Sequence, residues 1–328
     1  MKALWLDDGG MKIAELPRPR PAAGEALIRV MAAGVCRTDL ELARGYMNFS
    51  GVPGHEFAGV VEECEDRDRL GKTVTGEINL ACGACPFCWS GLSRHCPARE
   101  VLGIVKRPGA FAEFLTLPVE NLHELPAGMT PETGVFVEPV AACFEMLGQV
   151  SARAKRAAVL GDGKLGILAA RTLIGEAPSR LVLVGRHPEK LALVERDGIE
   201  TMLVAEFEQE VAAPDRRFEL VVEATGRAEG FSTALAAVRP RGVIVQKSTV
   251  AGLVPVDLSR VVVDEVTVAG SRCGPFGPAI AALASGRVRV DDLVTARFPL
   301  SRAVEAMEAA RAPGALKVLL EMKDDAGP

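Results

Sequence analysis

Four of the eight cysteines form a short cluster whose spacing suits a metal ion. They follow the pattern Cys82-x-x-Cys85-x-x-Cys88-x7-Cys96, and thiolates at such spacing can converge on one Zn²⁺ at about 2.3 Å each. Four thiolates leave no open coordination position, so we expect a structural zinc that holds a loop. An iron–sulfur cluster is the main alternative, disulfides are a less favoured one, and His95 could replace one thiol.

A second set of potential zinc ligands is dispersed along the chain. Cys36 lies in the segment 34–39, His55 and Glu56 follow a glycine, and Glu138 precedes Pro139. One cysteine, one histidine and one or two carboxylates would make a three-ligand catalytic zinc site with a position left for substrate or water. Because these residues are far apart in the sequence, their spacing alone does not establish that they meet. An isolated cysteine or histidine is more often a core residue.

A glycine-rich loop joins a predicted strand at 156–160 to a predicted helix at 165–173. The loop has the sequence Gly161-Asp162-Gly163-Lys164-Leu165-Gly166. In this context the pattern G-x-G-x-x-G is typical of dinucleotide binding. The first glycine allows the turn, the second lets backbone amides approach the pyrophosphate at the helix N-terminus, and the third lets the helix pack closely on the strand. We therefore expect the six loop residues to form part of a cofactor site.

The end of the next predicted strand indicates which cofactor is held. An acid about 20 residues after the loop normally binds the adenosine ribose of NAD. Here the strand at 181–184 is followed by Gly185, Arg186 and His187, with no acid. A small residue beside two basic ones leaves space and positive charge for a 2′-phosphate, which favours NADP over NAD. The alternative is that Arg186 is a solvated surface charge and that another residue holds the ribose.

The elements that must position these residues fall into two groups. Short apolar runs at 26–31, 57–61 and 111–117, separated by Gly and Pro, indicate an antiparallel or barrel-like β unit. From residue 156 strands alternate with helices, which indicates a doubly wound parallel sheet of the α/β class. The further elements expected there are a helix from 188 to about 196, strands at 220–224 and 242–246, and a helical pattern at 228–238. An amphipathic helix at 301–311 and a strand at 316–320 would return the chain to the first unit.

Length and composition restrict the class of protein. The 328 residues are 48% hydrophobic and 25% charged, with a formal net charge of −5. This composition supports two folded domains and argues against a dedicated nucleic-acid binder. No stretch approaches the roughly 20 apolar residues of a membrane span, and the acidic start argues against a signal peptide. We expect a soluble, cytoplasmic protein whose partner is a small molecule.

Taken in their order along the chain, these motifs resemble the zinc-dependent medium-chain dehydrogenase/reductase superfamily of alcohol and polyol dehydrogenases. The resemblance extends from the opening strands to Ala269-Gly-Ser271. It implies a GroES-like catalytic domain formed by residues 1–125 and 272–328, and a Rossmann dinucleotide-binding domain at 126–271. It also implies a homodimer or homotetramer, with an interface at the edge strand near 266–271.

The same resemblance implies roles for individual residues. Cys36, His55 and Glu56 match likely ligands of the catalytic zinc, and Glu138 is an alternative or water-mediated ligand. Thr38 matches the residue that accepts the substrate hydroxyl proton, although it could instead cap a helix. In addition to the loop and strand-end residues, the cofactor would contact Thr225, Ser271 and Arg272.

The function implied is hydride transfer between a CH–OH group and NAD(P), with two zinc ions per chain. The substrate would be a secondary alcohol, polyol, sugar or amino-alcohol. Among these the Glu138-Pro139 segment favours a polyol-like substrate, because it resembles the polyol branch. One alternative is an NADPH-dependent carbonyl reductase in a biosynthetic pathway. Another is a non-catalytic NADPH-binding sensor whose only zinc is the structural one.

Overall fold

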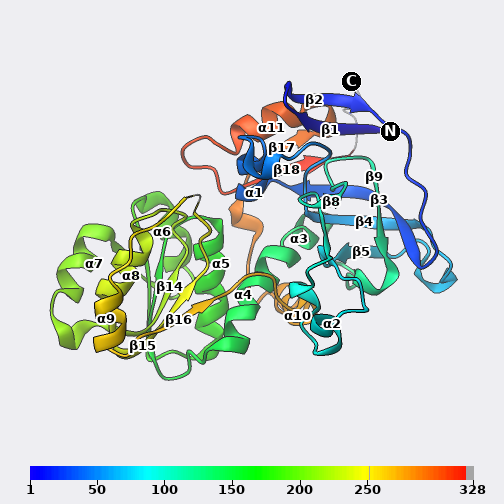
Figure 1. Cartoon of the computed structure of the whole chain (residues 1–328). Helices are drawn as coiled ribbons and strands as arrows, with labels where there is room; N and C mark the ends of the chain where they lie inside the picture. Colours follow the sequence, from blue (N-terminus) through cyan, green and yellow to red (C-terminus); the bar gives the residue numbers. More distant parts are fainter. Residues whose placement is uncertain (251, 323–328) are drawn as a thin grey trace. The chain divides into compact units, whose positions relative to one another are not determined.

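The computed structural model of the chain describes residues 1–250 and 252–322, and these divide into two compact units (Figure 1). The first unit comprises residues 1–138 and those from 293 onward, and the second comprises residues 139–292. Each potential metal centre lies within the first unit, and the glycine-rich loop lies within the second.

The first unit is built around a sheet in which, among the described residues, seven strands take part. Its order is β10-β5-β4-β3-β18-β17, and β9 also pairs with β3. The strands are β3 (Glu25–Gly34), β4 (Glu56–Glu63), β5 (Thr73–Gly76), β9 (Phe114–Pro118), β10 (Leu122–Glu124), β17 (Val294–Pro299) and β18 (Lys317–Glu321). The runs predicted at 26–31 and 57–61 are confirmed as β3 and β4. The apolar run at 111–117 forms a strand only from Phe114, because the preceding residues bridge to the N-terminal strand β1 instead.

The last strand of the chain completes the first unit, as the sequence predicted. Strand β18 pairs antiparallel with β3, with Leu319 opposite Gly34, and Gly34 in turn lies opposite Glu56 of β4. Residues almost 300 positions apart are therefore side by side where β3 ends. This register brings Lys317, Glu56 and the Cys36 loop into one region of the unit.

Two small sheets and four short helices complete the first unit. The small sheets pair β1 (Lys2–Asp7) with β2 (Gly10–Glu15), and β6 (Asn79–Leu80) with β7 (Glu100–Leu102) and β8 (Lys106–Arg107). The helices are α1 (Arg37–Leu42), α2 (Pro86–Trp89), α3 (Pro131–Gly134) and α11 (Ala303–Ala309). Helix α11 and the preceding 3-10 turn occupy the segment where the amphipathic helix at 301–311 was predicted.

The second unit is a parallel sheet of the expected doubly wound type. Its described strands have the order β13-β12-β11-β14-β15-β16, which places the crossover between β11 and β14. They are β11 (Arg156–Leu160), β12 (Arg180–Gly185), β13 (Glu200–Leu203), β14 (Phe218–Glu223), β15 (Val238–Gln246) and β16 (Thr267–Gly270). The sequence predicted β11, β12, β14 and β15 close to these bounds.

Helices lie on both sides of this sheet (Figure 1). They are α4 (Val137–Gln149), α5 (Lys164–Leu173), α6 (Pro188–Glu195), α7 (Val204–Val211), α8 (Gly230–Ala237), α9 (Leu258–Val263) and α10 (Phe276–Ala284). On one face, Phe207 of α7 and Leu235 of α8 pack with alternate strand residues such as Leu160, Val184 and Ile244 in one buried cluster. Buried apolar side chains on both faces are typical of a parallel sheet, and they fix its register.

The division between the units differs from the boundaries at 125 and 272 that the sequence suggested. Residues 126–138 stay with the first unit, where Arg297 forms an ion pair with Glu132. Residues 272–292 stay with the second. There a Cβ on Gly274 would lie 1.8 Å from the carbonyl oxygen of Ala141, and the buried guanidinium of Arg171 binds Asp292.

No helix in the described part of the chain is both long enough and apolar enough to span a bilayer.

Candidate metal centres and cofactor site

The four clustered cysteines meet at one point. Neighbouring sulfur atoms are 3.5 Å apart between Cys85 and Cys88, 3.8 Å between Cys85 and Cys96, and 3.5 Å between Cys96 and Cys82. Four sulfurs at about 2.3 Å from a tetrahedral zinc would be about 3.8 Å from one another. The sulfur positions therefore fit one zinc ion with no change of fold, and no histidine is needed to complete the set.

Local structure explains how this four-cysteine lobe is formed. Cys85 is the N-cap of α2, and Pro86 occupies the first helical position, where its missing amide hydrogen is harmless. Three residues later Cys88 faces the same side as Cys85, as helical spacing requires. A hydrogen bond from the backbone of Cys82 lowers the pKa of the Cys96 thiol to about 7, so the metal-binding thiolate is well populated near neutral pH.

Cys36, His55 and Glu56 also come together, although two segments of chain supply them. Their potential ligand atoms all lie within 4.8 Å of one another. Cys36 is the N-cap residue of α1, two residues after the end of β3, and His55 directly precedes β4, which begins at Glu56. His55 and Glu56 are buried, and Cys36 is partly exposed. One thiolate, one imidazole and one carboxylate are a donor set suited to zinc with an open fourth position.

Asp39 connects the two segments that carry these ligands. Its carboxylate is fully buried and accepts hydrogen bonds from the backbone amides of Cys36, at 2.8 Å, and Gly54, at 3.2 Å. Its Oδ1 atom also lies 3.3 Å from Nδ1 of His55, within ion-pair range. Sequence analysis did not single out Asp39. The only signal was its place three residues after Cys36, which suits a capping box.

The electrostatics of this buried site favour a cation. Burial alone would lower the pKa of His55, but the charges of Asp39 and Cys36 raise it well above the usual value. His55 Nδ1 is buried and makes no hydrogen bond of good geometry with any described residue. A buried imidazole with a carboxylate beside one ring nitrogen and a thiol close by is a setting suited to a metal ion.

Lys317 is a second residue that sequence analysis missed. Its ammonium group contacts Glu56 Oε2, and both side chains are fully buried. It also lies 5.4 Å from the centre of the Phe136 ring. Lys317 belongs to β18, so only the pairing of the last strand with β3 could have revealed it.

Two further predicted residues lie on nearby helices. Glu138 is in the first turn of α4 and is not among the three residues whose ligand atoms converge. Thr38 is the second residue of α1, and Cys36 holds the N-cap position. The alternative that Thr38 caps this helix is therefore wrong.

The glycine-rich loop has the local geometry expected for a dinucleotide site. Gly161 has a φ of +114°, which L side chains rarely adopt. A Cβ on Gly166 would lie 1.8 Å from the carbonyl oxygen of Gly161, so α5 packs tightly on the turn. A Cβ on Gly163 would meet nothing within 4 Å, which leaves the N-terminus of α5 open to an anion. The residues between them, Lys164 and Leu165, are partly exposed.

Asp162 of this loop reaches the end of the neighbouring strand β12. Its carboxylate accepts hydrogen bonds from the backbone amides of Arg186 and His187 and from the His187 ring. Strand β12 is followed by no acidic residue, but the Asp162 carboxylate of the loop lies at its end. Among the other predicted cofactor residues, Arg186 is exposed, and Gly185 is buried against Asp162.

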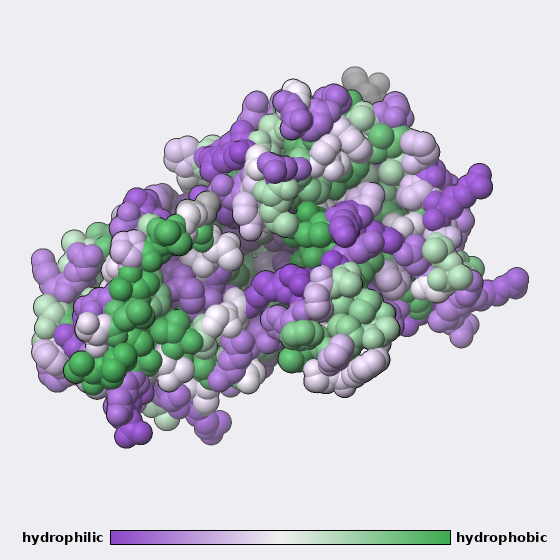
Figure 2. Space-filling model, in the orientation of Figure 1, coloured by the Kyte–Doolittle hydropathy of each residue, from purple (hydrophilic) through white to green (hydrophobic). Residues whose placement is uncertain are grey.

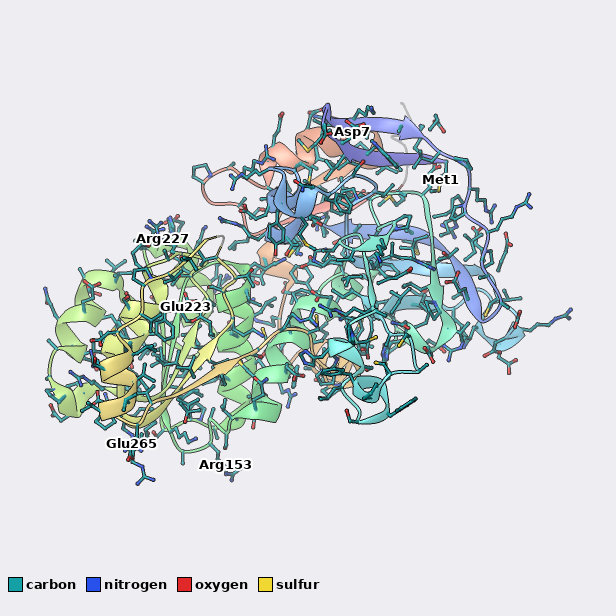
Figure 3. All side chains as sticks on the ribbon, in the orientation of Figure 1. Met1, Asp7, Arg153, Glu223, Arg227 and Glu265 are labelled. Carbon is teal, nitrogen blue, oxygen red and sulfur yellow. The ribbon has the colours of Figure 1, made fainter. Side chains whose placement is uncertain are left out.

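The remaining predicted cofactor residues lie beyond the ends of strands β14 and β16. Thr225 donates from both its backbone amide and its hydroxyl to the buried carboxylate of Glu223, which lies within the second unit (Figure 3). The buried ammonium group of Lys247 donates to the Ser271 hydroxyl and to the Arg272 carbonyl oxygen. The carboxyl edge of a doubly wound sheet is where such folds bind ligands.

The chain is similar to known dehydrogenases over most of its length. Residues 22–127 match the alcohol dehydrogenase GroES-like domain, and residues 132–322 match the glucose dehydrogenase C-terminus. Sorbitol dehydrogenase of Bombyx mori is 25% identical over 96% of both chains, and glucose 1-dehydrogenase of Methanocella arvoryzae is 32% identical over 74% of this chain and 75% of its own.

A solved structure extends the match to three dimensions. A zinc-binding dehydrogenase from Sinorhizobium meliloti bound to NADP superposes with a TM-score of 0.89, at 26% identity over 98% of both chains. The two matched families cover successive parts of the chain. The protein is thus an oxidoreductase, and it belongs to the zinc-dependent medium-chain dehydrogenase/reductase superfamily of alcohol and polyol dehydrogenases.

Proposed function

We propose that the protein transfers a hydride between a CH–OH group and a nicotinamide dinucleotide, with zinc at the Cys36–His55–Glu56 site. The observation that carries this proposal is the convergence of those three ligands in a chain that also has an intact glycine-rich loop. The four-cysteine lobe would hold a second zinc that has a structural role only.

The residues around the buried site have separate tasks in this reaction. Zinc supplies Lewis acidity, which lowers the pKa of an alcohol hydroxyl or polarises a carbonyl. Thr38, which lies in the first turn of α1 beside Cys36, would accept the hydroxyl proton and pass it on. Asp39 orients His55 and the Cys36 loop, and such outer contacts hold metal ligands in place. Glu138 would act, if at all, as an alternative or water-mediated ligand.

The substrate class follows from the relatives. The curated relatives described above act on sorbitol and on glucose, as their names state. These names and the Glu138-Pro139 segment support a polyol or sugar, and a secondary alcohol or amino-alcohol has the same reacting group. The shared requirement is a carbinol carbon that can lose a hydride.

The choice between NADP and NAD depends on the end of β12. The basic residues Arg186 and His187 support NADP, and the Sinorhizobium meliloti structure was solved with NADP. The Asp162 carboxylate at the same place supports NAD. A preference for NADP would also suit the alternative function, carbonyl reduction in a biosynthetic pathway.

The sensor alternative has no observation in its favour. It requires a chain with only the four-cysteine zinc, whereas three ligands of a second site converge here. Zinc content separates the two: about two ions per chain supports the enzyme, and about one supports the sensor.

A second copy of the chain is the partner we propose for the apolar surface of the second unit. Strand β16 is an edge of its sheet, and α9, which precedes it in the chain, exposes Val262 (73%) and Val263 (80%). Figure 2 shows an apolar patch over the part of the second unit where Figure 1 draws α9. An exposed edge strand with apolar neighbours can pair with its own copy about a two-fold axis. Whether the assembly is a dimer or a tetramer can be measured by light scattering.

The proposed location is the cytoplasm. All eight cysteines are free thiols, and the proposal uses five of them as zinc ligands. Thiolate metal sites of this kind suit a reducing compartment.

The experiment that tests the proposed function is a panel of alcohols and carbonyls assayed with NAD, NADP and their reduced forms on zinc-loaded protein. We expect turnover with at least one polyol, sugar or secondary alcohol. Thr38→Val should leave cofactor binding intact and lower turnover by about a hundredfold, and Thr38→Ser should restore most of it. Absence of turnover across the panel in protein with about two zinc ions would contradict the proposal.

A further inference from the structure

The loop carboxylate of Asp162 has an unusual set of partners. Its Oδ2 atom lies 2.6 Å from the amide nitrogen of Arg186, 2.8 Å from that of His187 and 2.9 Å from the ring nitrogen Nδ1 of His187. All three hydrogen bonds end on Oδ2, and no described residue donates to Oδ1. One carboxylate oxygen is thus fixed by the end of β12, and the other can still accept a hydrogen bond.

This arrangement keeps Asp162 ionised. Burial alone would raise its pKa, but the hydrogen bonds from Arg186 and His187 lower it below the usual value. Because the carboxylate has no proton, His187 Nδ1 must donate in this contact. The group at the end of β12 is therefore a fixed negative charge.

Gly185 and Asp162 fit each other closely. A Cβ on Gly185 would lie 2.5 Å from both Cβ and Oδ2 of Asp162. No side chain can therefore occupy the strand end while Asp162 points there. Because Gly185 has no side chain, Asp162 of the glycine-rich loop has the space to reach the end of β12.

The hydrogen-bond donors at the end of β12 that could bind a 2′-phosphate already bind Asp162. The amide of His187 belongs to the N-cap of α6, and amides at a helix N-terminus are the usual binding groups for an anion. Here this amide, that of Arg186 and the His187 ring all bind Asp162. A 2′-phosphate would meet a carboxylate in place of these donors, whereas a ribose hydroxyl could donate to Oδ1.

We infer that Asp162 is the acid that binds the adenosine ribose and that it makes the protein select NAD over NADP. This inference rests on the proposed use of a nicotinamide dinucleotide. It reverses the preference drawn from Arg186 and His187 in the sequence, because His187 is engaged by Asp162 and Arg186 is an exposed, solvent-screened charge. The ribose acid comes from the glycine-rich loop, where the common pattern takes it from the following strand.

Equilibrium binding of NADH and NADPH, followed by nicotinamide fluorescence on the full-length protein, tests the inference without any turnover. We expect the native protein to bind NADH at least about tenfold more tightly than NADPH. Asp162→Asn keeps the shape of the side chain and removes its charge. It should weaken NADH binding and move the ratio of dissociation constants toward NADPH by about tenfold or more.

A matched control removes the same charge close by. Glu189 is exposed in the first turn of α6 and has no place in the proposed site, so Glu189→Gln should leave the ratio unchanged. Asp162→Ser provides a second variant if Asp162→Asn does not fold, and thermal unfolding checks each protein.

Several results would overturn the inference. They are equal or tighter NADPH binding by the native protein, an unchanged ratio in folded Asp162 variants, or the same shift in Glu189→Gln. In these cases a dinucleotide still binds, so the proposed function stands. If the native protein bound neither dinucleotide, the proposed function and the inference would both fail.

Discussion

The two candidate metal centres of the first unit differ in what assembles them. The four-cysteine lobe draws its ligands from fifteen consecutive residues, and Cys82 at its start is exposed. The Cys36–His55–Glu56 site draws its ligands from the segment that follows β3 and from the start of β4, two strands that pair inside the seven-stranded sheet. In the lobe the apolar side chains of Phe87, Trp89 and Leu92 are exposed, whereas the buried site has Asp39 and Lys317 packed around it.

This contrast indicates opposite relations between metal and fold. A short loop with no core of its own gains its structure from the ion, so its zinc contributes directly to folding. A site whose ligands are already fixed by strands and by Asp39 is held by the protein, and its zinc is available for chemistry. Loss of the lobe zinc should thus affect stability, and loss of the buried zinc should affect turnover.

The largest expected difference is in turnover. Cys36→Ser removes a ligand from the buried site, and losing the Lewis acid should lower kcat by about a thousandfold, equivalent to about 4 kcal/mol. Cys96→Ser removes a ligand from the lobe and should leave kcat of the folded protein within about threefold. Steady-state assays and zinc content per chain measure both.

The unfolding temperatures of Cys36→Ser and Cys96→Ser provide the control for the turnover measurement. Cys96→Ser should lower the unfolding temperature clearly, and Cys36→Ser should lower it little. A thousandfold loss of kcat in folded Cys96→Ser protein would show that the two centres do not differ in the way described.

The next largest effect concerns Lys317, which belongs to the buried site alone. Lys317→Met leaves the buried carboxylate of Glu56 without its ammonium partner, and breaking a buried pair on one side costs about 3–5 kcal/mol. A nearby zinc ion would compensate part of that charge. The loss in unfolding free energy should therefore be greater in chelator-treated protein than in zinc-loaded protein, as denaturant titration can show.

Lys317→Arg keeps the positive charge and serves as the matched variant. It should retain most of the stability that Lys317→Met loses. If Lys317→Met lowered the unfolding free energy equally with and without zinc, the metal would not compensate the negative charge of Glu56.

The sequence predicted those parts of the molecule that depend on local patterns. The lobe could be recognised because its four ligands and their helical spacing lie in one segment, and β11 was predicted with its observed bounds because four apolar residues precede a glycine turn. The glycine-rich loop was recognised for the same reason. In the lobe, in β11 and in the glycine-rich loop, the residues that identify the feature are close neighbours in the sequence.

Features that depend on long-range pairing could not be predicted. Lys317 reaches Glu56 only because β18 pairs with β3, and nothing in the sequence around Lys317 indicates this. The side chain of Asp162 crosses to β12 because Gly185 leaves room, a relation between two residues on separate elements. The convergence of Cys36 with His55 likewise needed the resemblance to a family, since spacing alone left it open.

A moderate effect is expected from Asp39, which orients ligands without binding the metal. Asp39→Asn keeps the size of the side chain but removes the charge near His55 and places an amide group among backbone donors. Zinc affinity of the buried site should fall by about 10–100-fold, the usual range for such outer contacts. Chelator competition, with lobe zinc as the internal reference, measures it; an equal loss at both centres would indicate a general loss of fold instead.

The smallest effect is expected from the ion pairs beside the lobe. Glu77 lies 3.2 Å from the ring of His123 and 3.8 Å from the guanidinium of Arg94, and all three side chains are about one-third exposed or less. Pairs of this kind contribute less than about 1 kcal/mol because water screens them. Glu77→Gln should therefore shift the unfolding temperature by less than about 2 °C and leave lobe zinc bound. If it released that zinc, or lowered stability as much as Cys96→Ser, then ion pairs rather than the metal would hold the lobe, and the contrast between the two centres would no longer hold.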